Sequence, residues 1–296
     1  MTGPYLPRRV PGSCTREIRG LRQYCLTWAG QGTPLVLLHG FMDCAATFQF
    51  LVDALAGDRA VVAPDWRGFG QSAWNADGYW FPDYLADLEA WLDEWCPGEA
   101  ADVVGHSMGG NIALMYAGLR PERVRRLVTL EGFGLPGARA EMAPARYRDW
   151  LDALRAPEPA TTFPSLEVFA GVLRKRNPRL PPERAGFVAA AWSEALADGR
   201  VRVRFDPAHK RVNPVLYRRE EAEACWREVR APVLYVAGAE SEFMQRLRGA
   251  ADPEAMRAHI PQLEPRVVAG SGHMLHHDQP AAVARLVEDF LARPAP

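Results

Sequence analysis

Short apolar runs alternate with longer helical patterns along most of this chain, and this alternation limits the folds that it can adopt. An uninterrupted apolar run, such as residues 35–38, is typical of a strand buried on both faces. The segment 84–95 instead repeats its apolar residues at helical intervals. Strands that alternate with helices predict an α/β fold: a mainly parallel sheet with helices on both faces. We expect strands at 35–38, 60–63, 102–104, 124–130, 232–237 and 266–268, and helices at 47–55, 84–95, 111–119 and 280–291.

The alternation is interrupted between residues 134 and 228, where the chain is rich in proline and arginine. No strand is evident there, and helices are plausible at 147–154, 166–174, 184–196 and 220–229. A break between two halves of one alternating pattern predicts an inserted, mainly helical unit. We therefore expect one core made from residues 1–133 and 229–296, with residues 134–228 inserted into it. Near the N-terminus, two extended stretches around Gly20 predict a hairpin.

The strand predicted at 102–104 leads into Gly105-His106-Ser107-Met108-Gly109, and a helix is predicted directly afterwards. In such a turn, the G-x-S-x-G glycines remove Cβ atoms that would clash. The turn exposes the serine at the sheet edge, and the helix behind it supplies partial positive charge and free N–H groups. Ser107 is therefore the candidate nucleophile, and the Met108 N–H is a candidate donor to an oxyanion.

A serine nucleophile needs a base to accept its proton. Three histidines follow the strand predicted at 266–268: His273, His276 and His277. His273 comes directly after a glycine in the loop that leaves this strand, and from there its side chain can reach back over the sheet edge. We predict that His273 is the base, and that His276 and His277 are structural or solvent-facing.

A second oxyanion donor is predicted after the first buried strand, in His39-Gly40-Phe41. A chain that turns at this point can direct the Phe41 N–H toward the nucleophile. We expect His39 itself to be a structural residue that makes hydrogen bonds.

These segments together resemble the α/β-hydrolase fold superfamily. The matching pieces are LLHGF (37–41), PDWRGFGQS (64–72), VVGHSMGG (103–110) and GSGHMLHHDQP (270–280), in the order and at the spacing of that family. The resemblance implies an eight-stranded, mostly parallel sheet, with a lid or cap inserted after the sixth strand. It also implies kinship with serine hydrolase-like proteins, esterases, lipases and C–C hydrolases. Relatives with an aspartate nucleophile are excluded, because this chain has Ser107.

The acid of the implied triad departs from the commonest pattern. Most members of the family carry an aspartate three residues after the glycine that ends the seventh strand, where this chain has Ser241. Two carboxylates remain: Glu131, directly after the strand at 124–130, and Glu240, one residue before Ser241. Either strand end can serve if its carboxylate reaches the imidazole. We favour Glu131 and keep Glu240 as the alternative.

The expected activity is hydrolysis of a carboxylic ester, or a related acyl transfer, through an acyl-serine intermediate. The alternatives are C–C bond hydrolysis or amide and peptide cleavage on the same triad, and a small-molecule receptor without turnover. No cofactor and no metal are required by this chemistry. The expected partner is a small acyl compound.

The charge balance and cysteine spacing set further expectations. The net charge of −1 argues against nucleic acid as the main partner. No apolar stretch is long enough to predict a membrane span or a secretory signal. The five cysteines show no metal or redox spacing, so we expect free thiols and a cytoplasmic location. The sequence does not predict the oligomeric state.

Overall fold

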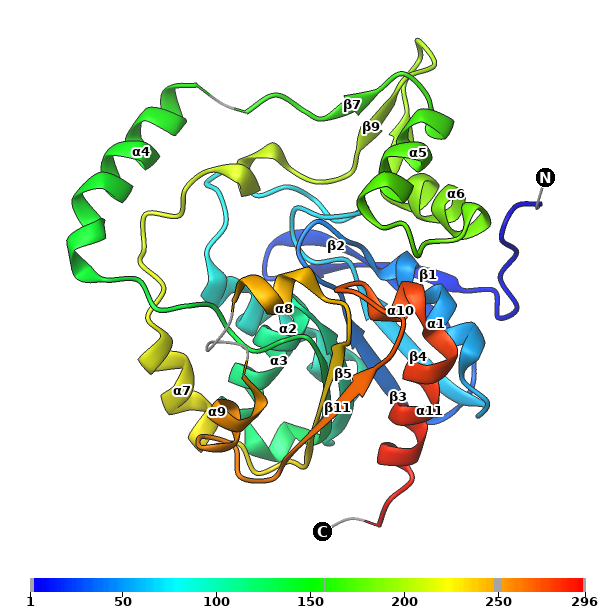
Figure 1. Cartoon of the computed structure of the whole chain (residues 1–296), viewed down its shortest axis with the longest axis vertical. Coiled ribbons are helices and arrows are strands. Elements are labelled where there is room, and N and C mark those ends of the chain that lie inside the picture. The colour runs from blue at the N-terminus through cyan, green and yellow to red at the C-terminus, as the bar shows by residue number, and fades with distance from the viewer. Residues whose placement is uncertain (1–2, 157, 248–251, 295–296) are drawn as a thin grey trace.

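An eight-stranded sheet forms the centre of the molecule, as the computed structural model shows for residues 3–156, 158–247 and 252–294 (Figure 1). The strand order is β1-β2-β4-β3-β5-β6-β10-β11. In this order, every neighbouring pair from β4 to β11 is parallel. β2 is antiparallel to both of its neighbours, β1 and β4. The predicted α/β-hydrolase sheet is therefore confirmed. The strands are β1 (Gly12–Ile18), β2 (Leu21–Trp28), β3 (Gln31–Leu38), β4 (Arg59–Pro64), β5 (Ala101–His106), β6 (Val124–Leu130), β10 (Val233–Gly238) and β11 (Leu263–Val268).

Helices cover both faces of this sheet, and the apolar residues of each face form a separate layer of the core. Leu88, Ile112 and Trp226 pack on one face, whereas Leu51 and Val287 pack on the other. Strands buried from both sides need apolar residues at every position, which explains their uninterrupted apolar runs. The helices around the sheet are α1 (Gln49–Ala54), α2 (Phe81–Trp95), α3 (Met108–Leu119), α7 (Arg219–Arg227), α8 (Glu242–Arg246), α9 (Pro253–Arg257), α10 (Leu275–Asp278) and α11 (Pro280–Leu291), with 3₁₀ turns η1 (Ala45–Phe48) and η2 (Pro121–Arg123).

The N-terminal hairpin forms as predicted, but the expectation of five free thiols is wrong. Cys14 and Cys25 are joined by a disulfide. Arg19 and Gly20 both have positive φ and form a two-residue turn, which pairs Ile18 with Leu21. That register places Cys14 opposite Cys25, with Cα atoms 5.2 Å apart, within the usual range for a disulfide. Disulfides are typical of oxidising compartments, so the cysteines no longer support the predicted cytoplasmic location.

The segment 134–228 combines helices with a small antiparallel sheet. The sheet has the order β7-β9-β8, and its strands are too short and polar to stand out in the sequence. The helix expected at 184–196 ends at Ala191, and the chain then forms β8. The elements here are α4 (Ala143–Arg155), β7 (Thr162–Phe163), α5 (Leu166–Arg176), α6 (Pro182–Ala191), β8 (Ser193–Ala195) and β9 (Val201–Val203), with η3 (Ala140–Met142) and η4 (Pro207–Lys210).

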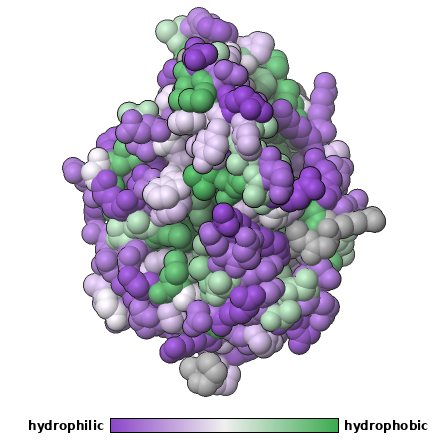
Figure 2. Space-filling view, turned by 90° about the vertical axis from the view of Figure 1, so that its left-hand side faces the viewer, coloured by the Kyte–Doolittle hydropathy of each residue, from purple (hydrophilic) through white to green (hydrophobic). Residues whose placement is uncertain are grey.

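The elements of this segment pack in three different ways. α5, α6 and β9 share a small apolar cluster that includes Phe50 of α1. α4 instead contributes no buried residue and lies at the left-hand margin of Figure 1. Figure 2 shows the corresponding face of the molecule, on which hydrophobic groups lie scattered among hydrophilic ones. The exposed residues of α4 include Tyr147, Leu151 and Leu154. α7 packs with the main core through Trp226, although it lies within the segment expected to be inserted. The boundaries at 134 and 228 stay a prediction.

Within the ranges described, no helix combines the length and the apolar character that a membrane span requires.

Candidate active site

Ser107 occupies the sharp turn between β5 and α3. Its φ of 49° and ψ of −113° are strained for a residue with a side chain. A Cβ atom on Gly105 would come within 2.6 Å of the Gly109 backbone, and one on Gly109 would collide with the carbonyl groups of Leu38 and His39. The two glycines are therefore required by close backbone contact, as expected for this turn.

His273 lies in the loop between β11 and α10, and its ring faces Ser107. His273 Nε2 is 3.1 Å from Ser107 Oγ. The ring of Phe243, from α8, packs against the imidazole with the ring centres 4.5 Å apart. The structure thus brings together the predicted nucleophile and the predicted base, which are 166 residues apart in the chain.

Glu131 reaches the other ring nitrogen of His273. Its Oε2 atom is 2.6 Å from His273 Nδ1, and its side chain is fully buried. The carboxylate also accepts hydrogen bonds from the Gly238 N–H and the Ser241 hydroxyl group, both at 2.8 Å. Glu131 has a φ of 54°, so it shares with Ser107 the left-handed backbone that marks functional turns. The predicted acid therefore lies in line with the nucleophile and the base.

Glu240 has a different environment. Its carboxylate pairs with Arg179 at 3.2 Å, and about half of its side chain is exposed. Ser241, at the position where the resemblance implies an aspartate, is buried and donates to Glu131. The structure thus brings Glu131 to the His273 ring and directs Glu240 to the surface. The sequence showed that Ser241 cannot be the acid, but it did not show that the Ser241 hydroxyl group would donate a hydrogen bond to the carboxylate of Glu131.

The loop after β3 brings Phe41 close to the nucleophile. A Cβ atom on Gly40 would be 3.2 Å from the Ser107 Cβ, so this loop passes directly against the serine turn. Buried His39 fixes the loop: its Nδ1 bonds the Gly40 carbonyl oxygen at 2.8 Å, and its Nε2 accepts from the Trp66 N–H. Burial lowers the pKa of His39, which favours this neutral form. Met108, the other predicted donor, is the first residue of α3, where an N–H has no acceptor within the helix.

His106 was not predicted to contribute to this site. Its ring is buried, and Nε2 bonds the His273 carbonyl oxygen at 2.9 Å. Burial, together with the neighbouring His276 and His273, keeps the pKa of His106 well below its ordinary value. A neutral His106 can donate from Nε2 and so hold the backbone of the loop that carries the base. Its position between Gly105 and Ser107 was the available signal, but the pattern assigns no role to that residue.

His276 and His277 are both buried in α10, so of the two predicted alternatives, structural or solvent-facing, the structure excludes the solvent-facing one. The short helix turns both side chains inward, where the His276 ring lies 4.5 Å from that of His106. With Asp43, they form the one group among the described residues whose side chains could together hold a metal ion.

The segment 134–228 contacts the loops around the site. Trp192 Nε1 donates to Asp43 in the loop that follows Phe41, and Arg184 donates to the His277 carbonyl oxygen. Arg179 pairs with Asp278, which accepts from the Gly272 N–H directly before His273. Part of this segment therefore lies at the same sheet edge as Ser107 and His273.

Comparison with known proteins agrees with this architecture. The α/β hydrolase fold family matches residues 33–280. The chain belongs to this family. It is 28% identical over 276 residues to a serine hydrolase-like protein of Danio rerio, covering 90% of this chain and 83% of that protein. It is 30% identical over 271 residues to a 3-hydroxybutyrate-oligomer hydrolase of Cupriavidus necator, covering 87% of this chain and 88% of that one.

A solved structure shares the fold over nearly its whole length. The thioesterase domain from the curacin biosynthetic pathway superposes with a TM-score of 0.81 at 25% identity, covering 94% of this chain and 99% of the domain. The relatives of this α/β hydrolase are thus named as hydrolases of more than one substrate class, and substrate choice must depend on residues around the shared centre.

Proposed function

We propose that this α/β hydrolase is a serine hydrolase that cleaves a carboxylic ester through an acyl-serine intermediate. The observation that carries the proposal is the continuous line of hydrogen bonds from Ser107 Oγ to His273 and on to Glu131. Ester and thioester hydrolysis require these three chemical roles and no others apart from an oxyanion site. No cofactor or metal has a step in this mechanism.

Glu131 determines which tautomer of His273 is present. A buried carboxylate at Nδ1 holds the proton on that nitrogen, which leaves the Nε2 lone pair facing Ser107. Ser107 Oγ then attacks the carbonyl carbon of the ester while its proton moves to Nε2. The imidazolium that forms is stabilised by Glu131, whose charge is in turn held by Gly238 and Ser241.

The negative charge on the former carbonyl oxygen needs preorganised donors. The N–H groups of Phe41 and Met108 are assigned this role, since the loop that carries Phe41 passes against Ser107 and Met108 follows Ser107 at the start of α3. Collapse of the tetrahedral intermediate breaks the ester C–O bond, and the alcohol leaves with the proton from Nε2. Water then attacks the acyl-serine, gives a proton to Nε2, and releases the carboxylic acid while Ser107 regains its proton.

The test is a panel of p-nitrophenyl esters of increasing acyl length, combined with labelling by a fluorophosphonate probe. We expect turnover of at least one ester and labelling at Ser107. In Ser107→Ala, labelling should disappear and kcat should fall at least about a thousandfold. Absence of both labelling and turnover in the folded native chain would reject the proposal in favour of a binding role.

A further inference from the structure

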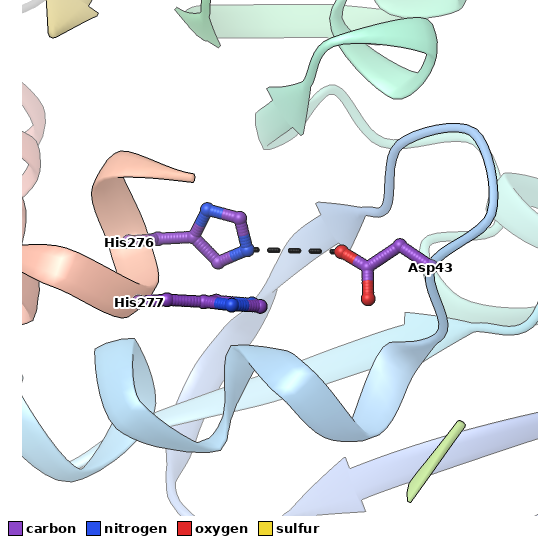
Figure 3. Close-up of side chains that lie close together, drawn as sticks. All are labelled: Asp43, His276 and His277. Carbon is purple, nitrogen blue, oxygen red and sulfur yellow. Dashed lines mark ion pairs between the residues drawn. The ribbon is translucent and has the colours of Figure 1, made fainter. Parts of the chain in front are cut away.

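A second group of reactive side chains lies buried beside the proposed active site. Asp43 follows Phe41 by two residues in the loop after β3, and His276 and His277 belong to α10 (Figure 3). The exposed fractions are 3% for Asp43, 0% for His276 and 1% for His277. One ligand atom from each residue lies within 4.8 Å of the other two. The proposed mechanism uses none of these three side chains.

The Asp43 carboxylate is held by one oxygen and leaves the other free. Oδ1 accepts from the Cys44 N–H, the Thr47 hydroxyl group and Trp192 Nε1, at 2.7 to 2.8 Å. Oδ2 faces His276 Nε2 at 3.8 Å, a separation marked by the dashed line in Figure 3. The hydrogen bonds to Oδ1 therefore orient the carboxylate so that Oδ2 points toward the imidazoles.

The groups that face one another lack hydrogen-bond partners. Among the described residues, none satisfies Asp43 Oδ2, either ring nitrogen of His276, or Nε2 of His277. A buried polar atom without a partner costs about 1–3 kcal/mol, and such atoms are rare in folded proteins. One ligand atom from each of the three residues lies within 4.8 Å of the other two, so a cation between them would accept lone pairs from groups that otherwise lack a partner.

We propose that Asp43, His276 and His277 bind a divalent transition-metal ion of the zinc type. Two imidazole nitrogens and one carboxylate oxygen suit such ions, whereas calcium and magnesium prefer sites made of oxygen atoms alone. Ligand bonds of about 2.0–2.2 Å require ligand atoms roughly 3–4 Å apart. The ligand atoms lie within 4.8 Å of one another, so binding would require side-chain rotations that bring them closer together. Thr47 and Trp192 supply the support that orients a metal-binding carboxylate.

The site would join two loops that matter for the proposed reaction. Asp43 belongs to the loop of Phe41, and His276 follows His273 by three residues. An ion bound between them would restrain both loops and raise the thermal stability of the whole chain. The proposal stands on metal binding alone, so its failure would leave the proposed esterase function untouched.

The experiment uses the full chain without a histidine tag, stripped of metal with a chelator. Zn²⁺ is titrated by calorimetry, and Co²⁺ is followed by its visible absorption. We expect one equivalent of either ion and a rise in melting temperature. Asp43→Asn and His277→Gln should each weaken binding by at least about tenfold, a conservative bound for removing a ligand. His259→Gln, at a partly exposed histidine outside the group, should bind like the native chain.

Three results would overturn the proposal: no stoichiometric binding, equal binding by His277→Gln and the native chain, or a Co²⁺ spectrum with a thiolate-to-metal charge-transfer band. The last result would assign the ion to cysteine. Circular dichroism checks that each variant folds. If Asp43→Asn does not fold because its hydrogen bonds are lost, His277→Gln decides the question, since Nε2 of that ring has no described partner to lose.

Discussion

At the scale of single residues, Ser241 holds the position where an aspartate is usual in this family, and its hydroxyl group donates to Glu131 instead. The carboxylate is thereby displaced from the end of β10 to the end of β6, two strands that are neighbours in the sheet. Both ends lie at the same edge, so both can reach one imidazole. Ser241 carries no charge, but its hydroxyl group stabilises the negative charge of Glu131 by a hydrogen bond.

Glu131→Gln should lower kcat by about a hundredfold to ten-thousandfold with the fold retained. The amide can donate to His273 Nδ1, which would move the ring proton to Nε2 and remove the acceptor that Ser107 needs. Ester hydrolysis measures the loss, and thermal unfolding checks the fold. Glu240→Gln makes the same chemical change at the exposed carboxylate and should change kcat less than about threefold. Similar losses in the two variants would contradict the assignment of the acid.

At the scale of elements, the sequence predicts most strands and helices because each spans one clear pattern of burial. Local patterns fail where a segment pairs with another strand. Residues 193–195 were expected to continue a helix, but Ser193–Ala195 instead form a strand that pairs with β9. The choice between Glu131 and Glu240 likewise depends on distances across the sheet, which no local pattern contains. The burial of His276 and His277 depends on how a four-residue helix is oriented. The sequence does single out Ser107, Phe41 and His273 as candidates, because each lies at the carboxyl end of a strand or in the loop that leaves it.

The pairing of Cys14 with Cys25 gives a prediction for the N-terminal hairpin. In the oxidised chain, alkylation after denaturation should label the three cysteines that are free in the structure, and reduction should raise the number to five. Mass spectrometry counts the labels. Because the bond closes a short loop, replacing both cysteines by serine should lower the free energy of unfolding by about 3 kcal/mol. Cys225→Ser, at a free thiol, should cost much less. Five labels without reduction would show that the bond does not form.

His209 gives a prediction for stability in acid. Burial lowers the pKa of His209 to about 4; its ring is stacked on Tyr79, and its Nε2 is hydrogen-bonded with the Tyr84 hydroxyl group. An unfolded histidine has a pKa of about 6.5, so between pH 6.5 and 4 the unfolded chain binds more protons. Stability therefore falls as the pH falls through this window.

The variant His209→Gln should lose less stability between pH 7 and pH 4 than the native chain, by up to about 3 kcal/mol. Urea denaturation at a series of pH values measures the difference. Each protein is compared with itself at pH 7. The stability that the variant loses at every pH, because the His209 hydrogen bonds are gone, therefore cancels. Parallel stability curves for the two proteins would show that His209 is not responsible.

At the scale of the whole molecule, the segment 134–228 is attached to the core unevenly. α5 and α6 pack on α1 through an apolar cluster, and Arg179 and Arg184 bind Asp278 and the His277 carbonyl oxygen in α10. α4, in contrast, buries none of its residues (Figure 1). The contacts near α10 are therefore the ones through which this segment can influence His273.

Arg179→Ala tests that attachment. Asp278 has a fully buried carboxylate, and removing Arg179 takes away its charged partner. The free energy of unfolding should fall by about 1–2 kcal/mol, a reduced value because Arg179 is itself one-third exposed. Urea denaturation provides the measurement. Arg176→Ala, at an exposed residue of α5, is the matched control and should change stability by less than about 0.5 kcal/mol. Equal effects would mean that the ion pair does not anchor the segment.

The arrangement of Glu131 and Ser241 also has a consequence for how such a site changes over generations. An ancestor with carboxylates at both strand ends would keep an oriented imidazole while either one was lost, so the acid could migrate between strands without an inactive intermediate. Ser241 would suit such an exchange, because it is a small polar residue that contacts the carboxylate of Glu131. The acid is thus the member of the proposed triad that either of two neighbouring strand ends could supply, whereas the serine depends on the one sharp turn between β5 and α3.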